Sequence, residues 1–94
     1  MTKMREIVAQ VSNEYQIDFQ ELLSPKRKQR VVVARQDAMW RMRQLKKDNG
    51  RNRYSYWQIA NLFNRDHSTV MHGERQHKKR MEESSAYRTT AYAE

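Results

Sequence analysis

Residues 55–83 read SYWQIANLFNRDHSTVMHGERQHKKRMEE, and this stretch decides the fold. It predicts a helix over residues 56–63 with Ser55 as its N-cap, then a three-residue turn, then a longer helix over about residues 67–83. Two helices joined by so short a turn form a helix-turn-helix. Spacing alone, however, does not separate this motif from an ordinary pair of antiparallel helices.

The segments before this stretch also have helical periodicity. Apolar residues recur at intervals of three and four over residues 4–15, and Asp18 is placed to cap a short helix that ends before Pro25. A longer helix is expected over residues 31–47, ended by the sequence at 48–50. Its expected inward face is Val32, Ala34, Ala38, Met39, Met42 and Leu45. The pattern predicts an all-α domain of about five helices over residues 1–83, followed by a flexible tail over residues 84–94.

The composition excludes several classes of protein. Two glycines and one proline in 94 residues are too few for a many-stranded β fold. With no cysteine there is no disulfide framework, thiolate zinc site or cysteine catalysis. The longest apolar run, residues 31–34, is too short to span a membrane, and no signal peptide follows Met1. We therefore expect one cytoplasmic domain.

The net charge of +8 is concentrated in one part of the chain. Residues 26–53 hold eleven Lys and Arg against two Asp, whereas the remainder is nearly neutral. Such a block indicates a face that binds a polyanion, although a merely solvated surface would have the same composition. A membrane surface is disfavoured, because the apolar residues that would have to enter the lipid are needed for the core.

Residues 59–72, IANLFNRDHSTVMH, resemble the signature of the C-terminal DNA-binding domain of the bacterial replication initiator DnaA. Residues 22–24, the basic loop after them and residues 34–39 resemble a second element of that family, so the resemblance covers about residues 4–83. The chain departs from the family at Gly73, where alanine or serine is usual, and at His77, where an apolar residue is expected. The resemblance implies a Trp-repressor-like fold of about five helices.

The resemblance also implies a role for individual residues. Arg27 would enter the minor groove, and Asp66, His67 and Ser68 would face bases in the major groove. The residues expected on phosphates are Arg35, Gln36, Arg43 and Thr69. For Lys26, Lys28 and Arg30 a phosphate contact and simple solvation are equally open. From the residues alone, Asp66, Ser68 or Thr69 could instead cap the last helix.

Other readings of the same residues are weaker. His67, His72 and His77 recur every five residues and do not share a helix face, so we expect no metal site and no cofactor. Adjacent residues such as Asp66 and His67 point apart on a helix, and we expect no catalysis. His72 is expected to pack beneath the turn, and Trp40 and Trp57 are expected to pack in the core or at the surface. An open alternative is that Tyr54, Tyr56 and Trp57 stack on single-stranded bases. Tyr87 and Tyr92 have no assigned role beyond a conceivable partner-docking segment.

The expected function is sequence-specific binding of double-stranded DNA at an A·T-rich nonamer, in the bacterial nucleoid and as a monomer. No G-x-x-x-x-G-K-S/T motif occurs, so we expect a DNA reader without the ATPase module of full initiators. The role would be that of a small transcriptional regulator or an origin-binding accessory. The alternatives are a phage or mobile-element antagonist that competes with the host initiator or binds host replication or transcription proteins, and a non-specific nucleic-acid binder.

Overall fold

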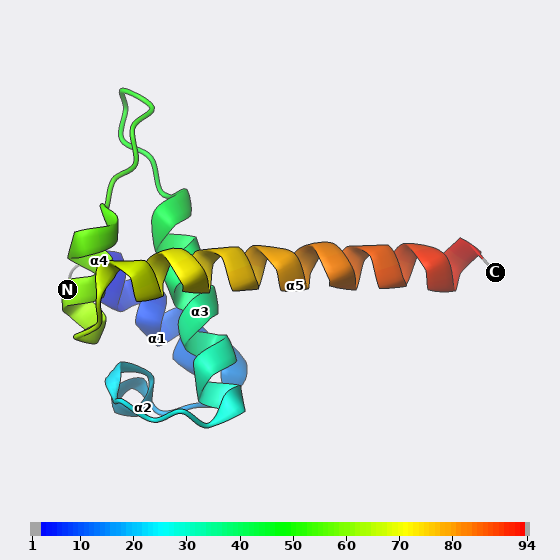
Figure 1. The fold of residues 1–94 in the computed structure, drawn as a ribbon, viewed down its shortest axis with the longest axis horizontal. Helices are drawn as coiled ribbons and strands as arrows, with labels where there is room; N and C mark the ends of the chain where they lie inside the picture. Colours follow the sequence, from blue (N-terminus) through cyan, green and yellow to red (C-terminus); the bar gives the residue numbers. More distant parts are fainter. Residues whose placement is uncertain (1–2, 94) are drawn as a thin grey trace.

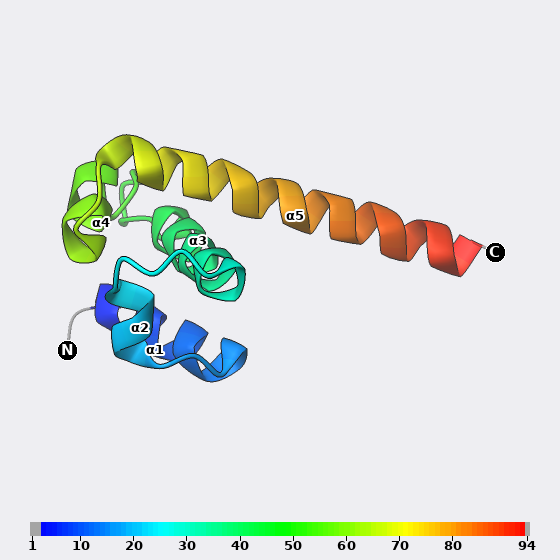
Figure 2. The same ribbon diagram turned by 60° about the horizontal axis from the view of Figure 1, so that its bottom comes forward.

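The computed structural model describes the backbone of residues 3–93 and the side chains of residues 3–84. It contains five helices in these residues: α1 (Lys3–Tyr15), α2 (Phe19–Leu23), α3 (Gln29–Gln44), α4 (Tyr56–Phe63) and α5 (His67–Ala93). α3 lies at the centre, with α4 and α5 on one side of it and α1 and α2 on the other (Figures 1 and 2). The predicted all-α fold of about five helices is confirmed.

Local capping explains where the short helices begin and end. The Asp18 carboxylate accepts a hydrogen bond of 3.2 Å from the backbone N–H of Gln20 at the start of α2. Ser55 and Gln58 form a reciprocal capping box at the start of α4. Asn64 ends α4 in the left-handed region, with φ of 53°. These polar side chains satisfy backbone groups that a helix end leaves unpaired.

The core of the described residues is formed by aliphatic residues, two methionines and one phenylalanine, Phe63, which is completely buried. On α3 the buried valine is Val31, whereas Val32 is only half-buried, so the predicted inward face is wrong by one residue at this end. Three consecutive valines have equal hydrophobicity, and periodicity alone therefore could not choose between them. The other inward residues expected on α3, apart from the half-buried Leu45, are fully buried: Ala34, Ala38, Met39 and Met42.

Close packing of α5 against α3 explains Gly73. A Cβ atom at this position would lie 2.9 Å from Sδ of the buried Met39 and 3.3 Å from Cγ of Gln36. The glycine thus lets α5 cross α3 without displacing a core side chain.

Two predicted helix ends are wrong. α3 ends at Gln44 rather than near residue 47, because the chain turns back there into a small hairpin. The sequence at 48–50 forms the tip of that hairpin and is not a helix cap; Gly50 has φ of 83°. α5 continues to Ala93, ten residues beyond its predicted end. The flexibility expected of the tail stays a prediction, and the side chains of Tyr87 and Tyr92 lie outside those described.

A buried polar cluster joins α1, α3 and α5. Asp37 accepts hydrogen bonds from the Tyr15 hydroxyl and from Nε of Arg41, both at 2.7 Å. Nε2 of His77 lies 3.5 Å from the same carboxylate, and the imidazole packs 5.2 Å from the ring of Trp40. Burial raises the pKa of Tyr15 to about 12, and burial also lowers the pKa of His77 against the opposing effect of Asp37. Burial of His77 therefore favours its neutral imidazole beside Asp37.

The low pKa of His77 predicts a loss of stability in mild acid. The unfolded chain binds a proton at His77 near pH 6.5, whereas the folded state binds it only at lower pH. The free energy of unfolding should therefore fall as pH drops below about 6.5, by at most about 1.4 kcal/mol per pH unit for this one proton. In His77→Leu the decrease in the free energy of unfolding that is due to His77 should be absent. Urea unfolding between about pH 7.5 and about pH 5.5 measures it. His72→Leu, at an exposed position, should retain it. Identical pH dependence in His77→Leu and the wild type would contradict the assignment.

Candidate nucleic-acid interface

The helix-turn-helix is formed by α4, the turn of residues 64–66 and the start of α5. The backbone N–H of Arg65 donates to the carbonyl of Ala60 at 2.9 Å, which closes the turn. Nη2 of Arg65 donates at 3.0 Å to the carbonyl of Ser24, in the loop between α2 and α3. The turn is thereby fixed to a loop that lies 41 residues earlier in the chain. We call residues 24–28 the α2–α3 loop.

Asp66 organises the first turn of α5. Its carboxylate accepts a hydrogen bond of 3.0 Å from the backbone N–H of His67 and one of 2.7 Å from the Ser68 hydroxyl. The Ser68 hydroxyl is the main cause that lowers the pKa of Asp66. The carboxylate therefore stays ionised at the positive end of α5, where a negative charge is favoured. Of the capping candidates that the sequence left open, Asp66 is the one whose side chain binds the backbone at the helix start.

The imidazole of His67 is held against α4. It stacks on the indole of Trp57 with ring centroids 4.4 Å apart and an interplanar angle of 13°. On its other side, Nδ1 lies 3.3 Å from a carboxylate oxygen of Asp66. Trp57 is 65% exposed, so the stacked pair lies at the surface. Sequence reasoning missed this role of Trp57, because nothing local signals a contact between residues on two different helices.

Arg35 has an internal role in the structure. This side chain is only 5% exposed, and its guanidinium donates to the carbonyls of Leu22 (2.9 Å), Ser24 (2.8 Å) and Lys26 (3.1 Å). Burial, together with the nearby charge of Arg65, lowers its pKa. Through Nε and Nη2, Arg35 holds the α2–α3 loop in place, and the phosphate contact expected of it stays a prediction.

Arg27 and Thr69 are brought together, as the predicted interface requires. Both line a depression of about 400 Å³ between the α2–α3 loop and the start of α5, whose other walls are Pro25, Val32, Arg35 and Arg65. The Arg27 side chain is exposed and has no hydrogen-bond or ion-pair partner among the described side chains. Arg27 is therefore available to a ligand on the surface where α5 begins.

The remaining predicted contacts are divided between internal and surface roles. Gln36 accepts a hydrogen bond of 2.5 Å from Arg80 of α5. Arg43 donates to the Tyr54 carbonyl at 2.8 Å and packs 3.8 Å above the ring of Tyr56. Both residues therefore join elements of the fold, and the phosphate contact expected of each stays a prediction.

At the surface, Arg30 donates to the carbonyls of Tyr15 and Gln16, and Lys26 pairs with Glu21 at 3.1 Å. Lys28 is exposed at the start of α3, with no such partner among the described side chains. His72 is exposed, so the prediction that it packs beneath the turn is wrong.

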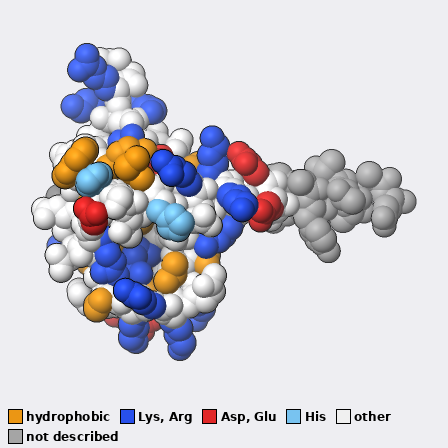
Figure 3. All heavy atoms as spheres, viewed as in Figure 1, with side chains coloured by type: hydrophobic (Ala, Val, Ile, Leu, Met, Phe, Trp, Pro, Cys, Tyr) orange, Lys and Arg blue, Asp and Glu red, His pale blue; other side chains and the backbone are white. Residues whose placement is uncertain are grey.

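The single basic block of the sequence becomes two separate surfaces. Three arginines of α3 beyond its first turn are used internally, since Arg41 pairs with Asp37 and Glu14 in addition to the contacts of Arg35 and Arg43. Exposed positive charge remains at the two ends of the block: the α2–α3 loop with the first turn of α3, and the hairpin after α3. Figure 3 shows these two groups of Lys and Arg at the lower edge and at the upper left of the molecule.

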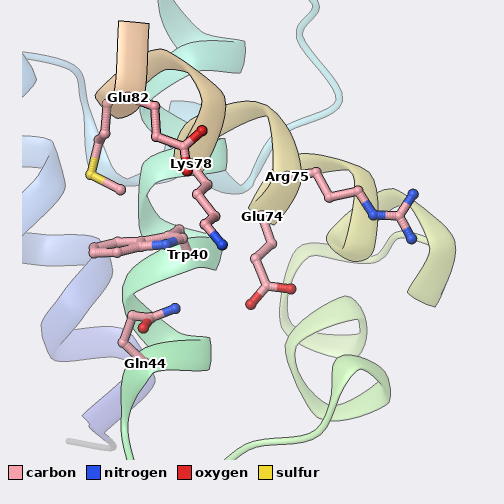
Figure 4. A pocket seen from close by; sticks show the side chains of 7 residues that line it. Trp40, Gln44, Glu74, Arg75, Lys78 and Glu82 are labelled. Carbon is pink, nitrogen blue, oxygen red and sulfur yellow. The ribbon is translucent and has the colours of Figure 1, made fainter. Parts of the chain in front are cut away.

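A larger cavity of about 690 Å³ lies where α5 leaves α3 (Figure 4). Trp40 and Gln44 form its α3 wall, and four charged residues of α5 with Met81 form the other: Glu74, Arg75, Lys78 and Glu82. The charges there are mixed, and none of the predicted DNA-contacting residues lines it. This cavity is separate from the candidate interface.

The fold and the surface of α5 define a helix-turn-helix DNA-binding domain. The family described as "Bacterial dnaA protein helix-turn-helix" matches residues 4–76, and the chain belongs to this family. The comparisons with curated proteins and with solved structures gave no match. In the described part of the chain, no helix has the length and apolar character needed to cross a membrane, and no three His, Cys, Asp or Glu side chains are grouped to hold a metal ion.

The position of Arg35 predicts a large structural effect of its removal. Arg35→Met removes the side-chain donor of the Leu22 and Lys26 carbonyls and leaves the Ser24 carbonyl with Arg65 alone, so we expect the free energy of unfolding to fall by roughly 2–4 kcal/mol in urea titrations. Arg27→Met, at an exposed neighbouring position, should change it by less than about 0.5 kcal/mol. Equal stability of the two variants would show that the loop does not depend on Arg35.

Proposed function

We propose that this domain binds double-stranded DNA sequence-specifically, with the N-terminal turn of α5 in the major groove and Arg27 in the adjacent minor groove. The observation that carries the proposal is the shared depression, because it places the free guanidinium of Arg27 beside Thr69 at the start of α5. A helix N-terminus facing base edges is the docking geometry of helix-turn-helix proteins. An arginine beside it suits a narrow A·T-rich minor groove, where negative potential is concentrated.

The residues at the interface then take different roles. His67 faces bases from a position fixed by Trp57, and the Ser68 hydroxyl retains lone pairs that can accept from a base while it donates to Asp66. Thr69, Lys26 and Lys28 bind phosphates and set the register, and Arg30 adds charge beside them. Arg35, Gln36 and Arg43 position the elements that contact DNA, in addition to the phosphate contacts that the family resemblance implies for them.

Duplex DNA is favoured over single strands as the ligand. Of the three aromatic residues that could stack on bases, Tyr56 lies under Arg43 and donates to Glu74 at 2.6 Å, and Tyr54 is half-buried. Only Trp57 is exposed, and His67 covers one of its faces. The three rings therefore do not form an open stacking surface.

In the cell we propose a monomeric, non-enzymatic regulator or origin-binding accessory of the nucleoid that recognises an A·T-rich nonamer. Binding-site selection from random duplexes with the purified protein tests this function. A sharp A·T-rich motif of about one DNA turn is expected. A flat profile would contradict sequence-specific recognition and leave only non-specific binding.

His67→Ala should abolish the discrimination between the selected site and random duplex without unfolding the domain. Loss of a base-facing side chain should weaken binding to the selected site by about 1–3 kcal/mol, and binding to random duplex much less. Thermal stability should change little, because the first turn keeps the Asp66 cap. Site selection and a melting curve on the same variant are the measurements. If the selected motif survives in His67→Ala, this imidazole does not read bases.

Arg27→Ala should weaken binding to the selected site more than binding to random duplex, because a minor-groove arginine senses groove width in addition to charge. Lys28→Ala, its exposed neighbour, should weaken both equally and by less, as a phosphate contact does. Fluorescence anisotropy titrations on the two duplexes measure the difference. Equal losses for Arg27→Ala on both duplexes would reduce Arg27 to a phosphate contact.

A further inference from the structure

The segment between α3 and α4 is an ordered hairpin that projects from the body (Figure 1). We call residues 45–53 the basic hairpin. Its two arms are joined by hydrogen bonds from the N–H of Lys47 to the carbonyl of Arg51 (2.8 Å) and from the N–H of Arg53 to the carbonyl of Leu45 (2.9 Å). At the tip, Asn49 accepts from the backbone N–H of Arg51, and Gly50 supplies the positive φ. The hairpin therefore has a defined shape although it touches little else.

The base of the basic hairpin is fixed to the helix-turn-helix. Arg43, in the last turn of α3, donates to the carbonyl of Tyr54 and packs on the ring of Tyr56, the first residue of α4. Glu74 of α5 accepts from the Tyr56 hydroxyl and lies 3.9 Å from Nε of Arg43. Any position that α4 and α5 take on DNA thus also determines where the hairpin lies.

The charge of the basic hairpin is positive and largely unneutralised. Four basic residues face solvent against one aspartate, Asp48: Lys46, Lys47, Arg51 and Arg53. Lys46 contacts Asn52 and Arg53 lies 5.5 Å from the Tyr54 ring, neither of which removes a charge. The side chains of Lys47 and Arg51 have no hydrogen-bond or ion-pair partner among those described. Both can therefore bind an external anion.

The position of the basic hairpin indicates which anion it binds. In Figure 1 the basic hairpin and the α2–α3 loop lie at opposite ends of the molecule, with α4 and the start of α5 between them. Along that direction the molecule extends 35 Å. One turn of B-DNA measures about 34–36 Å. Two basic elements at the ends of such a span match phosphates about one turn apart on a duplex that lies against α5.

We propose that the basic hairpin is a second DNA-binding element. It contacts the phosphates that flank the recognition site on the side opposite the α2–α3 loop. This inference rests on the proposed function for the position of the duplex. The hairpin contributes affinity and register but no sequence discrimination, because its free groups are flexible cationic side chains directed at the sugar–phosphate backbone. It extends the bound duplex beyond what the helix-turn-helix and the α2–α3 loop cover.

The test is the salt dependence of binding by the double variant Lys47→Gln/Arg51→Gln, which leaves the backbone hydrogen bonds of the hairpin in place. Loss of two phosphate contacts should make the slope of log K against log salt shallower by about 1.8. The matched control is Lys78→Gln/Lys79→Gln, which removes the same charge from exposed positions about three turns along α5. Its slope should stay within about 0.5 of the wild type. The selected motif should be the same for all three proteins.

Shortened duplexes locate the contact. Removal of the flank that the basic hairpin contacts should weaken wild-type binding to the level of the Lys47→Gln/Arg51→Gln variant. The same removal should not weaken binding by the variant any further. Equal slopes for the hairpin variant and the control, or equal sensitivity of wild type and variant to trimming, would overturn the proposal. A flat selection profile would contradict the proposed function alone, because the slopes on random duplex would still report whether the hairpin binds phosphate.

Discussion

The carbonyl of Ser24 is the point on which the interface depends. It accepts hydrogen bonds from two guanidinium groups, Arg35 at 2.8 Å and Arg65 at 3.0 Å. Arg35 comes from the central helix and Arg65 from the turn of the helix-turn-helix, so one acceptor joins α3, the loop that carries Arg27 and the start of α5. Without this junction, the element expected in the minor groove and the element expected in the major groove would have no fixed spacing. Specific recognition of DNA requires such a spacing, because the two grooves are at fixed positions on the duplex.

Burying guanidinium groups is unfavourable unless each finds acceptors, and the fold supplies them from the backbone. Arg35 uses three carbonyls, and Arg43 uses the Tyr54 carbonyl together with the ring of Tyr56. The guanidinium groups of these arginines bind within the fold, where each fixes a connecting segment against the helices. As a consequence, the exposed charge of residues 26–53 lies in the α2–α3 loop with the first turn of α3 and in the basic hairpin.

Local sequence patterns located most of the secondary structure. The caps Asp18 and Ser55 and the start of α5 at His67 were predictable, because capping depends on side chains within three residues of the backbone groups that they satisfy. The ends of α3 and α5 were not. α3 stops at Gln44 since the hairpin pairs its two arms by backbone hydrogen bonds, which leave little signal in side-chain periodicity. The inward valine of α3 was missed for a similar reason, as neighbouring valines are interchangeable until a partner surface selects one.

The sequence by itself determined the family, the helix-turn-helix and the candidate base-facing residues, because these depend on a contiguous motif whose spacing is set by the helix repeat. The tertiary structure decided which basic residues are free to bind DNA. Arg27 and Arg35 look equivalent in the sequence, yet one is exposed and the other is enclosed by carbonyls. The stacking of Trp57 on His67, the burial of His77 and the division of one basic block into two surfaces were likewise visible only in three dimensions. Each depends on contacts between segments that are distant in the sequence. No local pattern of residues encodes such contacts, because the burial and the hydrogen bonds of a side chain depend on the segment that packs against it.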